Sequence, residues 1–185
     1  MKRLLPLLLV LLLSGCGGTG NLMDRALTLR NTLENGNGCM FSCKVTADYG
    51  DFIYQFSMDC SVDSQNLLQF SVTAPDTIAG ITGNISGKEA NLVFDDVALA
   101  FQPMTDQLPS PVYGPWMLIH TLRSGYLTSC GLEDNQLRLS LDDSYQENAA
   151  HLDIYLNEND LPVQCDIFWE GRRLLTMEVE NFMFL

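Results

Sequence analysis

The stretch that decides the fold is residues 39–60, CMFSCKVTADYGDFIYQFSMDC. Apolar residues take every second position on both sides of Tyr49-Gly50, and polar residues stand between them. The apolar positions are Cys39, Phe41, Cys43, Val45 and Ala47 before the glycine, and Phe52, Tyr54, Phe56, Met58 and Cys60 after it. Because side chains alternate between the two faces of a strand, this pattern predicts an antiparallel hairpin with one buried and one wet face.

The cysteines of this hairpin suggest a covalent link. If Tyr49-Gly50 is a two-residue loop, Cys39 lies opposite Cys60 on the apolar side, which makes Cys39–Cys60 the first disulfide candidate. A pairing of Cys43 with Cys60 stays open, because a slip of register changes the partner. Five cysteines lie between Cys39 and Cys165, so at least one has no partner within this set.

The alternation continues through most of the chain. Further strands are predicted around residues 68–72, 78–86, 88–101, 137–141, 152–156, 163–169 and 175–179. Leu22, Ala26 and Leu29 follow a helical spacing after Asn21, and Ser110-Pro111 starts a second, almost wholly apolar helix that stops at Ser124-Gly125. We predict a mainly β (α+β) fold, a single antiparallel curved sheet or half-barrel with an N-terminal amphipathic helix and a central apolar helix.

The N-terminus resembles an export signal. Lys2 and Arg3 precede an apolar run from Leu4 to Leu13, and Ser14-Gly15 leads directly to Cys16. This order is similar to a bacterial lipobox, so residues 1–15 are predicted to be a lipoprotein signal peptide and residues 16–20 a lipidated cysteine with its tether. The expected location is extracytoplasmic, with Cys16 carrying acyl chains such as palmitate that anchor the protein to a membrane. Residues 21–185 are predicted to form one domain.

Composition excludes several kinds of partner. The chain has 23 acidic and 10 basic residues, a formal net charge of −13. Such a surface repels nucleic acid and anionic headgroups, so no nucleic acid is expected as a partner and membrane attachment depends on the acyl anchor. There is no Gly-x-Ser-x-Gly elbow and no glycine-rich phosphate loop. The spacing of the cysteines with His120 and His151 is poor for zinc. We therefore expect no metal, no cofactor and no catalysis.

The order of these elements resembles the LolA-like superfamily, which includes lipoprotein carriers and mycobacterial lipid-transfer lipoproteins. The stretches 45–51 (VTADYGD), 78–83 (IAGITG) and 178–182 (EVENF) look closest to small anchored lipoproteins of gut Firmicutes. The resemblance covers residues 21–185. It implies a half-barrel around a hydrophobic cavity, with helices at the mouth, and a role in handling lipid or acyl chains.

The predicted cavity is lined by aromatic, aliphatic and methionine side chains of the strands and the central helix: Tyr54, Phe56, Met58, Phe70, Val72, Phe94, Trp116, Met117 and Ile119. An ordinary filled core is the alternative interpretation of the same residues. The expected function is non-catalytic binding of a lipid, an acyl chain or a lipidated protein at the outer face of a membrane. The alternative is a protein-interaction or envelope-sensing module on the same fold, with an envelope protein as partner and no ligand.

Overall fold

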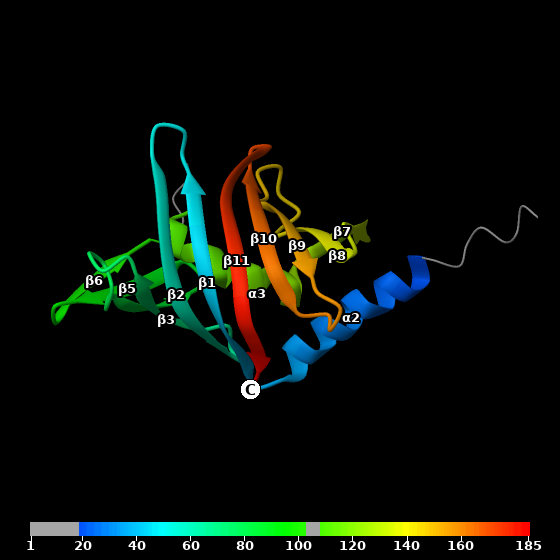
Figure 1. The fold of residues 1–185 in the computed structure, drawn as a ribbon, viewed down its shortest axis with the longest axis horizontal. Coiled ribbons are helices and arrows are strands. Elements are labelled where there is room, and N and C mark those ends of the chain that lie inside the picture. The colour runs from blue at the N-terminus through cyan, green and yellow to red at the C-terminus, as the bar shows by residue number, and fades with distance from the viewer. Residues whose placement is uncertain (1–18, 103–107) are drawn as a thin grey trace, which may run out of the picture.

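One open antiparallel sheet dominates the structure. A computed structural model describes residues 19–102 and 108–185, and there the eleven strands follow the order β6-β5-β4-β3-β2-β1-β11-β10-β9-β8-β7 (Figure 1). The last strand inserts beside the first, so β1 and β11 lie at the centre while β6 and β7 form the two edges. The predicted fold class, a single antiparallel sheet that is not closed, is confirmed.

The strands have these bounds: β1 Gly38–Asp48, β2 Ile53–Asp63, β3 Leu68–Ala74, β4 Thr82–Ser86, β5 Glu89–Phe94, β6 Val97–Phe101, β7 Tyr126–Glu133, β8 Gln136–Asp142, β9 His151–Leu156, β10 Pro162–Trp169 and β11 Arg172–Phe184. Every strand predicted from alternation is present. Strand β7 was not predicted, because its sequence YLTSCGLE mixes small, polar and apolar residues without a clear period of two.

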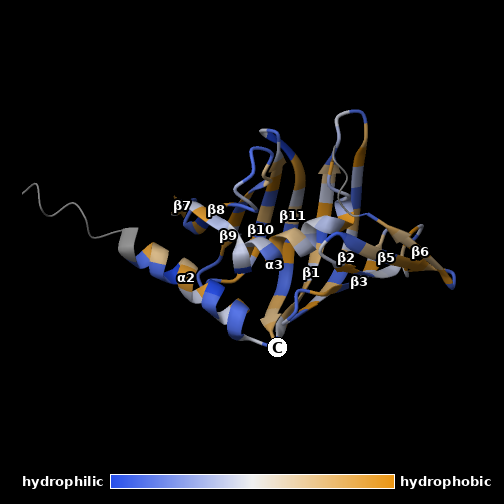
Figure 2. Cartoon of the chain, turned by 180° about the vertical axis from the view of Figure 1, so that it is seen from behind, coloured by the Kyte–Doolittle hydropathy of each residue, from blue (hydrophilic) through white to orange (hydrophobic). Residues whose placement is uncertain are grey.

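Two helices lie on the inner side of the sheet (Figure 2). Helix α2 (Thr19–Asn35) buries Ala26, Leu29 and Leu33, which confirms the predicted helical face, and it contacts α3 and β7. A short 3-10 turn, η1 (Pro111–Tyr113), leads from Ser110 into α3 (Gly114–Ser124), which ends at Gly125 as predicted. Among the described residues, no helix combines the length and apolarity needed to cross a membrane.

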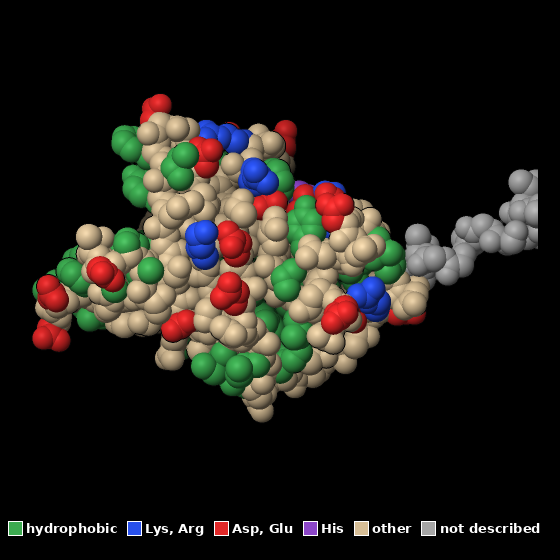
Figure 3. Space-filling model, in the orientation of Figure 1, with side chains coloured by type: hydrophobic (Ala, Val, Ile, Leu, Met, Phe, Trp, Pro, Cys, Tyr) green, Lys and Arg blue, Asp and Glu red, His purple; other side chains and the backbone are tan. Residues whose placement is uncertain are grey.

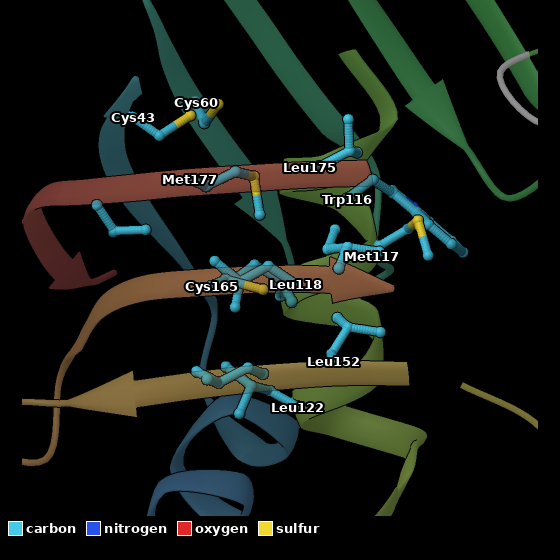
Figure 4. Packing of buried hydrophobic residues seen from close by; sticks show 14 of the residues in the cluster. Cys43, Cys60, Trp116, Met117, Leu118, Leu122, Leu152, Cys165, Leu175 and Met177 are labelled. Carbon is cyan, nitrogen blue, oxygen red and sulfur yellow. The ribbon is translucent and has the colours of Figure 1, made fainter. Parts of the chain in front are cut away.

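The predicted register of the first hairpin is wrong. Asp48 pairs with Ile53, so the loop holds four residues instead of two, and Cys39 lies opposite Val62 while Cys60 lies opposite Phe41. The Cys39–Cys60 disulfide is therefore not formed, and all five cysteines of the described residues are free thiols. Cys60 instead neighbours Cys43 (Figure 4). Burial, followed by a hydrogen bond with Cys43, raises the pKa of Cys60, and burial raises the pKa of Cys39 to about 12.

The core lies between the centre of the sheet and α3. Figure 4 shows Trp116, Met117, Leu118 and Leu122 of the helix meeting Leu152, Cys165, Leu175 and Met177 of β9 to β11, all of them buried. Gly114 permits this close approach: a methyl group added there would lie 2.9 Å from the Met177 sulfur. The helix thus covers the middle of the inner face with buried side chains.

Candidate ligand groove

An apolar groove lies beside this core, on the half of the inner face formed by β2 to β5. Its volume is about 430 Å³, within the range of roughly 300–1,000 Å³ that small-ligand sites occupy. The lining residues come from three strands and two connecting segments: Ile53, Tyr54, Gln55, Phe56, Val72, Pro75, Ile78, Ile81, Leu92, Pro111 and Val112. None of these side chains carries a charge. Because the Gln55 amide lies on the opposite face of β2, bonded to Thr46, the groove offers apolar contact and one neutral polar side chain, that of Tyr54.

One wall of the groove is the connection between β3 and β4. Backbone hydrogen bonds hold it against β3: Gly80 N–H donates to the Val72 carbonyl at 2.9 Å, and Val72 N–H donates to the Ile81 carbonyl at 2.8 Å. Gly80 has φ +89°, a conformation that favours glycine, and it lets the chain return toward β3. Ile78 and Ile81 are therefore presented to the groove by a segment with fixed backbone bonds.

A second wall is η1, and a half-buried tyrosine fixes it. The Tyr49 hydroxyl, at the tip of the β1–β2 hairpin, donates to the carbonyl of Pro109 at 2.6 Å. Burial, with a contribution from Tyr54, raises the pKa of Tyr49 to about 12, so the phenol keeps its proton at neutral pH. This bond ties the hairpin to the segment that supplies Pro111 and Val112.

The structure divides the residues predicted to line a cavity into three groups. Tyr54, Phe56 and Val72 line the groove. Phe94 lies on β5, 44% exposed and outside the groove lining. The remaining five belong to the packed core: Met58, Phe70, Trp116, Met117 and Ile119. Whether any of them contacts a ligand stays a prediction.

Aromatic side chains of η1 and α3 contact one another and the β2–β3 turn. The rings of Tyr113 and Trp116 stack with centroids 4.8 Å apart, and Trp116 stacks on His120 at 4.3 Å. The Trp116 indole N–H donates to the Asn66 carbonyl at 2.8 Å. The Asn66 amide donates in turn to His120 Nδ1 at 2.8 Å, which requires that nitrogen to be unprotonated. This aromatic column is structural.

Sequence reasoning missed the groove residues that lie in connections. Ile78, Ile81, Pro111 and Val112 stand in turns or at a helix start, where no period of two or 3.6 marks a side chain as inward-facing. The apolar residues of β5 and β6 were the one sequence signal for apolar surface on this half of the inner face. Val97 and Leu99 pair with Phe94 and Leu92, yet they are 58% and 64% exposed. Beyond the groove, the inner face therefore continues as an uncovered apolar strip (Figure 2).

A larger hollow lies elsewhere and has different chemistry. Its volume is about 720 Å³, and its lining includes Glu147, His151, Phe168 and Glu170. His151 is held between two carboxylates, with Nδ1 2.8 Å from Asp142 and Nε2 3.3 Å from Asp153. Polar and charged groups around an open hollow do not favour an apolar guest, so size alone does not identify the site.

The carboxylates near this hollow also accept hydrogen bonds from neighbouring side chains of the sheet. Asp153 is 5% exposed and accepts from the Ser140 hydroxyl at 2.6 Å and from the Arg138 guanidinium at 2.8 Å. These bonds lower its pKa despite the opposing effect of burial, which is the largest single influence. In the described ranges, no three histidine, cysteine or acidic side chains are grouped so that they could hold a metal ion.

Several solved structures share the general arrangement at low sequence identity. An uncharacterized conserved protein from Thermus thermophilus is 13% identical, with a TM-score of 0.47 over 90% of this chain and 86% of that one. A LolA superfamily protein from Nitrosomonas europaea is 9% identical, with a TM-score of 0.45 over 91% and 94%. The lipoprotein LppX from Mycobacterium tuberculosis is 8% identical, with a TM-score of 0.44 over 88% and 95%. No family profile and no curated protein sequence matches the chain.

These likenesses concern the path of the chain and carry no functional residue across. The closeness to gut Firmicutes lipoproteins stays a prediction. Cys16, the predicted lipidation site, lies outside the described residues.

Proposed function

We propose that the protein binds the acyl chain of a lipid in the groove between β2–β5 and η1. The observation that carries the proposal is the groove itself, about 430 Å³ in volume and lined without a single charged side chain. Three of its lining residues, Tyr54, Phe56 and Val72, are among those proposed from the sequence to contact such a ligand.

The energetics favour a flexible apolar guest over a peptide. Each methylene buried from water contributes about 0.8 kcal/mol, so a chain burying roughly eight of them gains about 6 kcal/mol. A peptide in the same place would bury backbone amides against side chains that offer only the Tyr54 hydroxyl as a partner. Binding then depends on filling the whole groove, with no single contact dominating.

The proposed activity takes place at a membrane. We propose that residues 1–15 direct export, that Cys16 is lipidated, and that the domain acts in the cell envelope as an anchored lipoprotein. A proposed role in binding alone requires no catalytic group, and an envelope protein that delivers or receives the lipid is compatible with it.

Substituting one groove leucine by a charged residue tests the proposal. Leu92 lines the groove and is half-buried, so Leu92→Glu places a carboxylate in the path of the chain at modest cost to folding. We expect native mass spectrometry of the detergent-extracted full chain to detect a lipid adduct on the wild type and to find it lost in Leu92→Glu.

The matched control is Leu132→Glu, the same change at a leucine that is 62% exposed on edge strand β7, outside the groove. It should retain the adduct. Loss of the adduct in both variants, or in neither, would show that the lipid is not held in this groove.

A further inference from the structure

The charges around the groove influence which lipid head group can bind there. From residue 49 to residue 112, the described part of the chain holds seven acidic residues and one basic residue, Lys88. Lys88 stands in the turn between β4 and β5, at the opposite end of β4 from Ile81. The half of the sheet that forms the groove is therefore strongly acidic, and its one described cation lies away from the groove lining.

Two of the acidic residues, in contrast, are close in sequence to the lining: Asp76 follows Pro75 in the wall, and Asp51 sits in the hairpin loop before Ile53. Asp95 and Asp96 form the turn between β5 and β6, beyond Phe94. All four are exposed. Figure 3, which shows the outer face of the sheet and not the groove, also shows acidic side chains at the β5–β6 end.

The guanidinium near the hairpin tip is already engaged. Arg172 reaches the loop beside Gly50, but its Nη2 forms an ion pair with Asp48 at 3.0 Å and also donates to the Asp48 carbonyl. An anionic head placed at this end of the groove would meet Asp51 and an arginine whose charge is compensated. Like charges within about 10 Å repel one another at ordinary ionic strength.

One neutral polar side chain, that of Tyr54, lines the groove. Its hydroxyl both donates and accepts, whereas the Gln55 amide lies on the opposite face of β2, where it donates to the Thr46 hydroxyl at 3.2 Å. Hydroxyl and ester groups match the Tyr54 hydroxyl, whereas a carboxylate would need a cation or several N–H donors in place of lost water.

We propose that the groove selects lipids whose acyl chain ends in an uncharged head, such as a glyceryl ester, and discriminates against free fatty acids. This inference rests on the proposed function and specifies its ligand class. Discrimination comes from repulsion by the acidic rim and from the absence of a cation in the lining.

A competition between two lipids with the same acyl chain tests the inference. The full chain in detergent is incubated at pH 8 and low salt with equal amounts of lauric acid and monolauroylglycerol, and native mass spectrometry measures how much of each is bound. In the wild type we expect the amount of bound glyceryl ester to exceed the amount of bound acid by about 10-fold. Such a ratio needs only a modest difference in binding free energy.

Reversing one charge at the rim shows whether the groove is responsible. Asp76→Lys should lower the ratio of bound ester to bound acid by at least about three-fold, because the lysine attracts the carboxylate of lauric acid. Glu158→Lys, the same kind of reversal in the turn between β9 and β10, should leave the ratio unchanged. Each probe partitions into the detergent to the same extent in every sample, so a change of the bound ratio between variants reports the protein.

The outcomes separate the two proposals. A ratio near one, a preference for lauric acid, or an equal fall in Asp76→Lys and Glu158→Lys would overturn the selectivity while leaving acyl binding in place. If neither probe binds the wild type, the proposed function fails and the selectivity fails with it.

Discussion

Arg123 holds three separate parts of the fold together, so its removal should be costly. It is 8% exposed, on the last turn of α3. Its Nε donates to the carbonyl of Leu33 at the end of α2, at 3.0 Å, and its Nη1 donates to the Asp63 carbonyl at 2.8 Å and to the Asn66 side-chain oxygen at 3.2 Å. All three acceptors are uncharged.

The size of the effect follows from these contacts. Arg123→Met keeps most of the apolar stem but leaves three acceptors without their donor, and each unsatisfied buried group costs about 1–3 kcal/mol. Part of that cost is offset, because a charged group no longer has to be buried and because water reaches the edge of the β2–β3 turn. We expect a net loss of about 2–4 kcal/mol in the free energy of unfolding. A loss of 3 kcal/mol lowers the melting temperature of a chain this size by about 6–12 °C.

Urea denaturation of the purified full chain measures this loss, provided that the slope of free energy against urea is the same in both proteins. Arg25→Met is the matched control. Arg25 forms a half-exposed ion pair with Asp160 at 2.6 Å, and such pairs contribute about 0–1 kcal/mol. A loss below 1 kcal/mol for Arg123→Met, or equal losses for both variants, would refute the role of Arg123 as a connector.

Three further predictions concern the column and the walls. Burial lowers the pKa of His120 below its ordinary value of about 6.5, so the stability that the neutral ring contributes is complete above that pH and declines as the pH falls; melting curves should show this decline, and His120→Gln, which can still accept from Asn66, should make the decline smaller. Tyr49→Phe removes the bond to Pro109 and should cost about 0.5–1.5 kcal/mol in urea denaturation and weaken lipid retention, whereas unchanged retention would show that η1 is held by other contacts. Gly83→Ala should cost about 1–3 kcal/mol because its methyl group would meet the Asn91 carbonyl and the Phe70 ring, whereas Gly131→Ala, with nothing within 4 Å, should be nearly neutral.

The sheet could be predicted from the sequence because alternation is a local signal. Apolar residues from Phe41 to Val45 and from Leu137 to Leu141 identify their strands without any knowledge of partners. The helix from Ser110-Pro111 to Gly125 was equally visible, since a proline start and a glycine stop mark its ends. Strand β7 lacks that signal, and it is defined instead by its pairing with β8.

The register of the first hairpin depends on the length of its loop, which is four residues and not the predicted two. Tyr49 N–H donates to the Phe52 carbonyl at 3.0 Å, and Gly50 N–H donates to the Asp48 carboxylate at 2.8 Å, so a four-residue loop closes the hairpin. Two additional loop residues move Cys60 opposite Phe41 and remove the geometry on which the predicted disulfide rested.

The alternation marks Phe56 and Met58 as inward-facing, yet it does not show which part of the inner face is covered. In the structure Met58 is fully buried, whereas Phe56 lines the groove together with Pro111 and Val112 of η1. That difference depends on tertiary packing, which no local pattern encodes.

The most direct test of the account is where a bound acyl chain lies. A monoacylglycerol with a photoreactive diazirine in its chain, added to the full-length protein and illuminated, labels whatever surrounds the chain, and peptide mass spectrometry locates the adducts. The account predicts labels on Tyr54, Phe56, Ile81 or Leu92. Labels gathered instead around His151 and Phe168, in the larger polar hollow, or spread evenly over the surface, would contradict it.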